Sequence, residues 1–165
     1  MRTIPLALAL PSYVASFMLL LFTPYSKSIA APSRFFCGTS QGKPATLVRT
    51  RRGDRPIVIW ERSLGGNTAQ QRCQIASNRF QNAYDAGRLN YLTVGEDNNQ
   101  AVVCTAEVKD GDCNYTLFTL KPGADPNAAL RKLLEIRAYA ENSVIYEGAG
   151  GRVYVDFQAY LRLID

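Results

Sequence analysis

Four cysteines limit what this chain can fold into more than any other feature of its sequence. They are Cys37, Cys73, Cys104 and Cys113, and no two of them are spaced as Cys-x-x-Cys. That spacing is typical of thioredoxin-like redox motifs and of many zinc sites, so neither is indicated here. An even number of cysteines in an exported chain predicts structural disulfides. Whether Cys73 is a reactive thiol, a metal ligand or one end of a disulfide therefore depends on where the chain resides.

The N-terminal residues have the pattern of a secretory signal peptide. Arg2 supplies a short basic region, an uncharged apolar run extends from Ile4 to Phe22, and small residues lead up to Ala30. We therefore expect cleavage after Ala30, with residues 1–30 as the signal peptide. The alternative is an uncleaved membrane anchor, but the uninterrupted apolar stretch, residues 13–22, is shorter than the roughly 20 residues that a spanning helix needs. The sequence predicts an exported protein, in a periplasm, a lumen or outside the cell.

The remaining residues, 31–165, are enough for one ordinary domain and too few for two. Charge is distributed unevenly along them: residues 31–90 carry ten lysines and arginines against three acidic residues, and residues 91–165 carry seven against eleven. A basic half and an acidic half indicate a polar face for a partner more than a nucleic-acid protein. Export also argues against a nucleic-acid partner.

The chain contains no histidine. Histidine is the commonest general base at neutral pH and the commonest zinc ligand, so Ser-His-Asp and Cys-His catalysis are excluded. A calcium loop is also not indicated, because Tyr115 and Lys121 stand where a loop starting at Asp110 would need glycine and glutamate. We expect no catalytic residue, no cofactor and no metal ligand.

The positions of the cysteines favour one of the three possible connectivities. Cys104 and Cys113 are close in sequence and flank "TAEVKDGD", whose Asp-Gly pair indicates a turn between two strands. Cys37 and Cys73 would then tie an opening strand to the helix that packs over it. We predict the disulfides Cys37–Cys73 and Cys104–Cys113.

Periodicity and turn residues divide the chain into strands and helices. Asn67 or Thr68 is placed to cap a helix that Gly87 ends, and Asp125 and Pro126 are placed to begin a second one. A turn around Gly53 joins two strands into a hairpin. The "DFQAYLRLI" segment either extends the last strand or forms a short helix capped by Asp156. The predicted strands are 32–37, 45–52, 56–62, 90–94, 101–108, 115–120 and 152–155, and the predicted helices are 67–86 and 126–141.

Short turns between the strands favour antiparallel pairing, and each helix needs its apolar face covered. We therefore predict an α+β fold: one antiparallel sheet of about five to six strands, two main helices packed mainly on one face, and two disulfides.

Several stretches carry a resemblance to a known family. They are "FFCGTSQGKPATLVRT", "PIVIWERSLGG", "QRCQIASNRFQNAYDAGRLNYLTVGEDNNQAVVC" and "LFTLKPGADPNAALRKLL". With its four cysteines, the chain resembles the circadian oscillating polypeptide family of cyanobacteria over about residues 35–140. The "EDNNQ" turn departs from the pattern, where we expect Asn-Gly. The resemblance implies an exported, often membrane-associated protein without known chemistry, and it assigns no catalytic residue.

Four arginines gather on the predicted first hairpin: Arg49, Arg51, Arg52 and Arg55. One interpretation is a contact surface for an anionic partner, such as phospholipid headgroups, acidic polysaccharide or an acidic patch of a protein. The other is a solvated hairpin edge that its charges protect from aggregation.

The leading hypothesis is an exported, non-enzymatic module that binds an unknown protein or an anionic membrane or envelope surface through its basic half. An alternative is a thiol-disulfide redox protein or sensor that uses Cys104 and Cys113. A third possibility, a hydrolase acting on envelope sugars, would require two carboxyl groups in one cleft.

Overall fold

The folded part of the chain begins with a meander of three antiparallel strands in the computed structural model, which describes residues 33–135 and 145–165. Pairing of Thr50 with Gly53 places the second turn at Arg51 and Arg52, so the predicted hairpin is confirmed and its turn lies just before Gly53. The strands are β1 (Phe35–Ser40), β2 (Lys43–Thr50) and β3 (Gly53–Ile59), in the order β1-β2-β3.

Helix α1 (Ala69–Asp85) follows the first sheet and has both of its predicted ends. Thr68 caps it: the Thr68 hydroxyl accepts a hydrogen bond from the Gln71 amide at 3.2 Å, and the Gln71 side chain accepts one from the Thr68 amide at 2.8 Å. This reciprocal capping box satisfies two donors that a helix start leaves unpaired. Gly87 follows the helix with a φ of +66°, a conformation that glycine adopts without steric cost.

A second antiparallel sheet contains the remaining strands. Strands β4, β5 and β6 follow one another along the chain as hairpins, and β8 returns to pair with β4, so that Leu92 lies opposite Val155. The strands are β4 (Tyr91–Asp97), β5 (Gln100–Ala106), β6 (Tyr115–Thr119), β7 (Ile145–Glu147) and β8 (Val153–Asp156), in the order β6-β5-β4-β8-β7.

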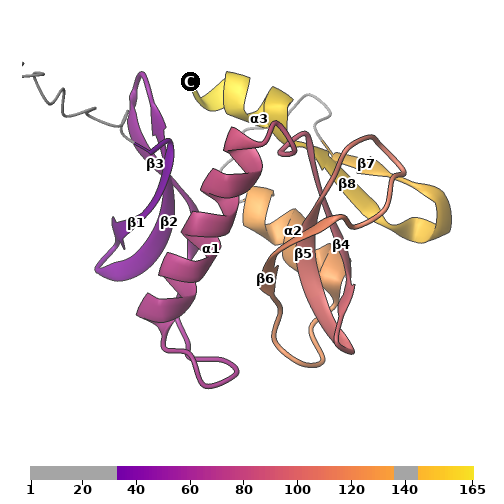
Figure 1. Cartoon of the computed structure of the whole chain (residues 1–165), viewed down its shortest axis with the longest axis horizontal. Helices are drawn as coiled ribbons and strands as arrows, with labels where there is room; N and C mark the ends of the chain where they lie inside the picture. Colours follow the sequence, from indigo (N-terminus) through magenta and orange to yellow (C-terminus); the bar gives the residue numbers. More distant parts are fainter. Residues whose placement is uncertain (1–32, 136–144) are drawn as a thin grey trace, which may run out of the picture. The chain divides into compact units, whose positions relative to one another are not determined.

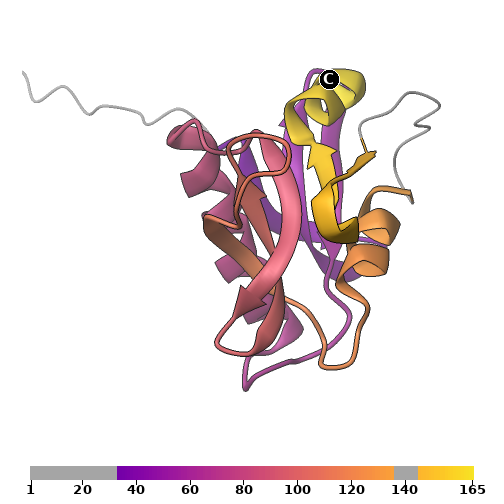
Figure 2. The same cartoon turned by 90° about the vertical axis from the view of Figure 1, so that its right-hand side faces the viewer.

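Two further helices begin with aspartate caps. Helix α2 (Pro126–Glu135) starts where Asp125 accepts a hydrogen bond from the Ala128 amide at 3.1 Å. Its predicted continuation to residue 141 lies outside the described residues. Helix α3 (Phe157–Ile164) starts where Asp156 accepts from the Ala159 amide at 2.7 Å. The helical alternative for "DFQAYLRLI" is therefore correct (Figure 2).

Aromatic rings join the two ends of the chain in the core. Phe35 of β1 lies 5.5 Å from Phe80 of α1 and 6.2 Å from Phe157 of α3, measured between ring centroids. Phe80 and Phe157 are themselves 5.9 Å apart. These three side chains are buried, so strand, helix and C-terminal helix share one hydrophobic cluster.

The α+β class, the antiparallel pairing and both disulfides are as predicted, but the strands divide between two sheets where the sequence suggested one. Helix α1 contacts β1 and β2 on one side and β6 on the other, and thus lies between the sheets (Figure 1). The side chains of Cys73, Ala76, Phe80 and Ala83 on this helix are buried. Strand β7 was not predicted.

Residues 32–165 form one unit. The predicted signal peptide and the cleavage after Ala30 lie outside the described residues. Within the described part, no helix is long and apolar enough to span a membrane.

Candidate functional site

The four predicted arginines lie together at one end of the first sheet. Arg49 belongs to β2, Arg55 to β3, and Arg51 and Arg52 form the turn between these strands. All four side chains are exposed. We call this group, Arg49, Arg51, Arg52 and Arg55, the basic hairpin surface.

Only one of these guanidinium groups has a clear internal partner. The Arg49 side chain donates to the carbonyl of Ser33 and lies over the ring of Phe36, 4.4 Å from its centroid. In the described part of the chain, no ion pair engages the side chains of Arg51, Arg52 or Arg55. Their charges therefore face solvent.

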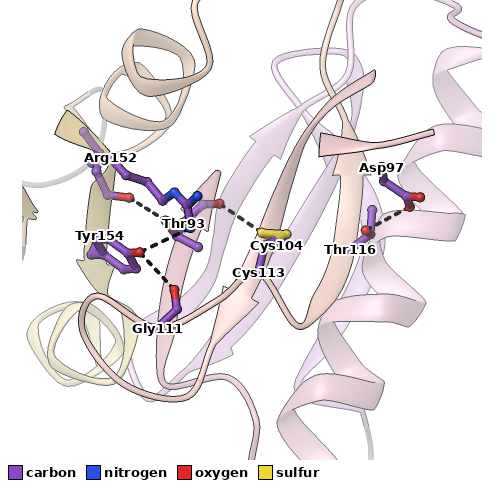
Figure 3. Close-up of a disulfide and its surroundings, with 9 residues drawn as sticks. Thr93, Asp97, Cys104, Gly111, Cys113, Thr116, Arg152 and Tyr154 are labelled. Atoms are coloured by element: carbon purple, nitrogen blue, oxygen red, sulfur yellow. Dashed lines mark hydrogen bonds between the residues drawn. A yellow bond between two sulfur atoms is a disulfide. The ribbon is translucent and has the colours of Figure 1, made fainter. Parts of the chain in front are cut away.

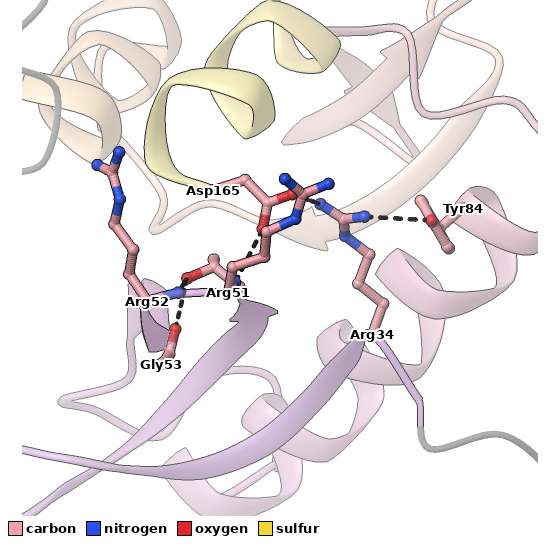
Figure 4. A network of polar contacts seen from close by, with 7 residues as sticks. Arg34, Arg51, Arg52, Gly53, Tyr84 and Asp165 are labelled. Carbon is pink, nitrogen blue, oxygen red and sulfur yellow. Dashed lines mark hydrogen bonds and ion pairs between the residues drawn. The ribbon is translucent and has the colours of Figure 1, made fainter.

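A carboxylate from the far end of the chain fixes the hairpin turn (Figure 4). Asp165 accepts a hydrogen bond from the backbone amide of Arg51 at 3.0 Å and lies 3.9 Å from the guanidinium of Arg34. Arg34 also donates to the Tyr84 hydroxyl at 3.3 Å. Sequence reasoning missed Arg34 and Asp165 because no local pattern links residues so far apart.

The disulfide Cys104–Cys113 joins β5 to the loop that precedes β6 (Figure 3). Cys104 is fully buried and its sulfur lies 3.7 Å from the carbonyl oxygen of Thr93, whereas Cys113 is half-buried. The same loop is held at Gly111, whose carbonyl accepts a hydrogen bond from the Tyr154 hydroxyl at 2.9 Å. The bridge therefore sits in a loop that a second contact also holds in place.

The disulfide Cys37–Cys73 ties β1 to α1, as the sequence predicted. Cys73 is fully buried on the helix face that covers the first sheet. The structure thus answers the question about Cys73: it is one end of a structural bridge. All four cysteines are paired.

A comparison with family models matches residues 34–162 to the family described as circadian oscillating protein COP23. The chain belongs to the COP23 family. No curated protein and no solved structure matches the chain.

Stretches that carried the family resemblance have identifiable structural roles. In the "RCQ" stretch, Cys73 forms a disulfide and Arg72 lies over the Trp60 ring, 4.7 Å from its centroid. In "YLTVG", Gly95 leaves room for the Cys113 sulfur, because a Cβ at Gly95 would lie only 2.7 Å from it. These COP23 residues build the fold around the two bridges.

Arg72 is a partly buried arginine whose guanidinium is held by backbone carbonyls. Its guanidinium donates to the carbonyl of Arg62 at 3.1 Å and to that of Thr119 at 3.0 Å. Partial burial lowers the pKa of Arg72 from its usual value. No carboxylate of the described residues forms an ion pair with it. Sequence reasoning passed over Arg72, although its place beside Cys73 was a usable signal.

The described residues offer little for acid–base or metal chemistry. They contain no group of three or more cysteine, aspartate or glutamate side chains that could hold a metal ion. Three surface cavities described here each contain at most one carboxylate, so none provides the pair that a sugar hydrolase requires. Glu61, in one of them, forms a hydrogen bond with Lys43 that lowers the pKa of the glutamate.

Proposed function

We propose that this COP23-family chain is an exported, non-enzymatic module that binds an anionic membrane surface through the basic hairpin surface. The observation that carries the proposal is the exposure of Arg51, Arg52 and Arg55 without carboxylate partners in the described part of the chain. Exposed arginines that are not neutralised within the protein are free to pair with phosphate groups.

The location of these arginines suits contact with a flat surface. They occupy a turn and the two strand ends beside it, so they project from one tip. Their backbone is held by Asp165, which bonds the Arg51 amide without neutralising the exposed guanidinium groups. Each basic residue close to an anionic bilayer contributes about 1 kcal/mol of binding free energy.

Two disulfides in one small domain fit an oxidising compartment, which supports export. The signal peptide expected in residues 1–30 would deliver the chain to such a compartment. The family resemblance implies membrane association, and such association requires a protein surface that contacts the bilayer. The exposed arginines can supply that surface.

The test is co-sedimentation of the folded protein, residues 31–165, with vesicles. Vesicles that contain phosphatidylglycerol should bind it, and vesicles of phosphatidylcholine alone should not. The double variant Arg51→Glu with Arg52→Glu should lower the partition coefficient at least about thirtyfold, which corresponds to the loss of two attractive charges. High salt should weaken native binding, because exposed charges are screened beyond about 10 Å at 0.1 M salt.

The matched control is Lys109→Glu with Lys132→Glu, which changes the net charge equally at two exposed positions outside the hairpin. If both double variants lose binding to the same extent, net charge rather than the basic hairpin surface governs association. If Arg51→Glu with Arg52→Glu binds vesicles as the native protein does, the surface assignment is wrong.

A further inference from the structure

Arg72 lies at the border of two adjoining surface cavities. Arg72 and Leu64 line both cavities. The guanidinium of Arg72 is held over Trp60 and by the carbonyls of Arg62 and Thr119, as described above. Two of its five N–H groups are used in these hydrogen bonds, and the remaining donors have no hydrogen-bond partner among the described residues.

The first cavity has a volume of about 210 Å³ and lies between α1 and β6. Its lining is mixed: the apolar side chains include Trp60, Leu64 and Ile75, and the polar ones include Asn67 and Gln100. Arg79, one of its two charged residues, lies two helical turns after Arg72 on α1. Ile75 is 41% exposed, one of three large hydrophobic side chains of the described structure left so open.

The second cavity is larger, about 540 Å³, and lies between the segment after β3 and the segment after β6. Ile59, Leu64 and Pro122 give it apolar walls, and Arg62 and Lys121 add two positive charges to that of Arg72. Its carboxylate, Glu61, forms a salt bridge with Lys43, which is not a lining residue.

We propose that the two cavities form one binding site for a small organic anion, a molecule with a carboxylate or phosphate group on an apolar body. Arg72 would hold the anionic group at the border, and the second cavity, with Ile59, Leu64 and Pro122 in its wall, would take the apolar body. Arg62, Arg79 and Lys121 line the same cavities, and the described structure gives their side chains no ion pair.

The chemistry of the lining residues decides the class of ligand. A cation would meet four positive side chains and one carboxylate that is already paired. An uncharged apolar molecule would leave the free N–H donors of Arg72 without a partner, which is costly in a partly buried site. An organic anion satisfies those donors and covers the apolar wall at once. Pockets of a few hundred cubic ångströms with a few convergent polar groups are typical of small-molecule sites.

This site shares no residue with the basic hairpin surface, so it goes beyond the proposed membrane contact. A test of one proposal does not decide the other. Trp60 is the single tryptophan of the chain, so its fluorescence reports directly on the site. The experiment titrates the folded protein, residues 31–165, with octanoate, with octyl phosphate and with 1-octanol. Octanoate or octyl phosphate should change the fluorescence saturably, and 1-octanol should bind at least about tenfold more weakly, since its hydroxyl carries no negative charge to pair with the guanidinium of Arg72.

The variant that tests the site without breaking the contacts of Arg72 is Arg79→Gln with Lys121→Gln. It should weaken binding of the anion at least about tenfold and leave thermal unfolding unchanged. The matched control, Arg51→Gln with Arg55→Gln, removes two charges from the hairpin and should bind the anion as the native protein does.

Three results would overturn the proposal: no saturable response to either anion, equal affinity for octanoate and 1-octanol, or native affinity in Arg79→Gln with Lys121→Gln. A preference for octyl phosphate over octanoate, or the reverse, identifies the head group and supports the site in either case.

Discussion

Gly95 on β4 lies directly against Cys113, so that a Cβ at Gly95 would come within 2.7 Å of the Cys113 sulfur and 2.8 Å of its Cβ. Side-chain atoms do not approach so closely without displacement. The absence of a side chain at Gly95 is therefore what allows the Cys104–Cys113 bridge to pack on the second sheet. This relationship links the "YLTVG" strand to the disulfide across the loop.

Gly95→Ala should destabilise the protein by about 1–3 kcal/mol, as overpacking of a tight site does. The sign is diagnostic, because alanine usually stabilises a strand relative to glycine. Urea unfolding measures the difference. In a Cys104→Ala, Cys113→Ala background the cost of Gly95→Ala should shrink, since the obstructing sulfur is gone. An equal cost in both backgrounds would show that the disulfide is not the obstacle.

Thr46 organises a buried polar cluster between the first sheet and α1. Its hydroxyl oxygen accepts hydrogen bonds from Trp60 Nε1 and from the Ser77 hydroxyl, each at 3.0 Å. Thr46→Val should cost about 2–5 kcal/mol, because it leaves two buried donors unpaired. Thr46→Ser keeps the oxygen and should cost only about 1 kcal/mol for the lost methyl group. Thermal unfolding compares the two variants, and equal losses would mean that packing, not hydrogen bonding, sets the role of Thr46.

Asp165 should protect the turn of the basic hairpin surface from opening. Its side chain accepts from the Arg51 amide at 3.0 Å, so Asp165→Ala should speed hydrogen exchange at that amide about fivefold, as loss of one hydrogen bond of about 1 kcal/mol implies. Asp165→Asn retains an acceptor oxygen and should keep most of the protection. Exchange followed residue by residue by NMR measures both. Unchanged exchange in the alanine variant would show that the contact does not hold the turn.

The Cys104–Cys113 bridge should resist mild reductant in the folded protein. Thiol-disulfide exchange requires an attacking thiolate to reach a sulfur; Cys104 is fully buried in β5, and the half-buried Cys113 packs its sulfur against Gly95 of β4. Mass spectrometry after alkylation, with dilute dithiothreitol and no denaturant, should find no modified cysteine, and the same treatment in urea should modify all four. Opening of this bridge in the folded state would instead favour the redox alternative that uses Cys104 and Cys113.

Features encoded by neighbours in sequence were predictable. The Thr68 cap, the Gly87 stop, the Asp125 and Asp156 caps and the β2–β3 hairpin depend on residues within a few positions of one another. The pairing of Cys104 with Cys113 was open to the same reasoning because only a turn separates them. The basic hairpin surface was recognised for the same reason, since its four arginines lie within seven consecutive positions.

Relationships between distant segments could not be predicted in this way. The alternation of apolar and polar residues along a strand shows which of its faces is buried, but not which other strand it pairs with. The sequence therefore did not reveal that α1 separates the strands into two sheets. The three residues of β7 are too few to carry a pattern. The same holds for two contacts between segments that are distant in sequence: Gly95 with Cys113, and Asp165 with Arg51. No sequence pattern links the residues of either pair.

The sequence by itself determined the Cys104–Cys113 pairing, the caps at the helix starts, the cluster of arginines at the β2–β3 turn and the absence of histidine chemistry, because each depends on residue type and short-range spacing. Only the tertiary structure decided the two-sheet architecture and the site around Arg72. That site requires α1, the segment after β3 and the segment after β6 to converge, and their convergence results from packing of the whole core.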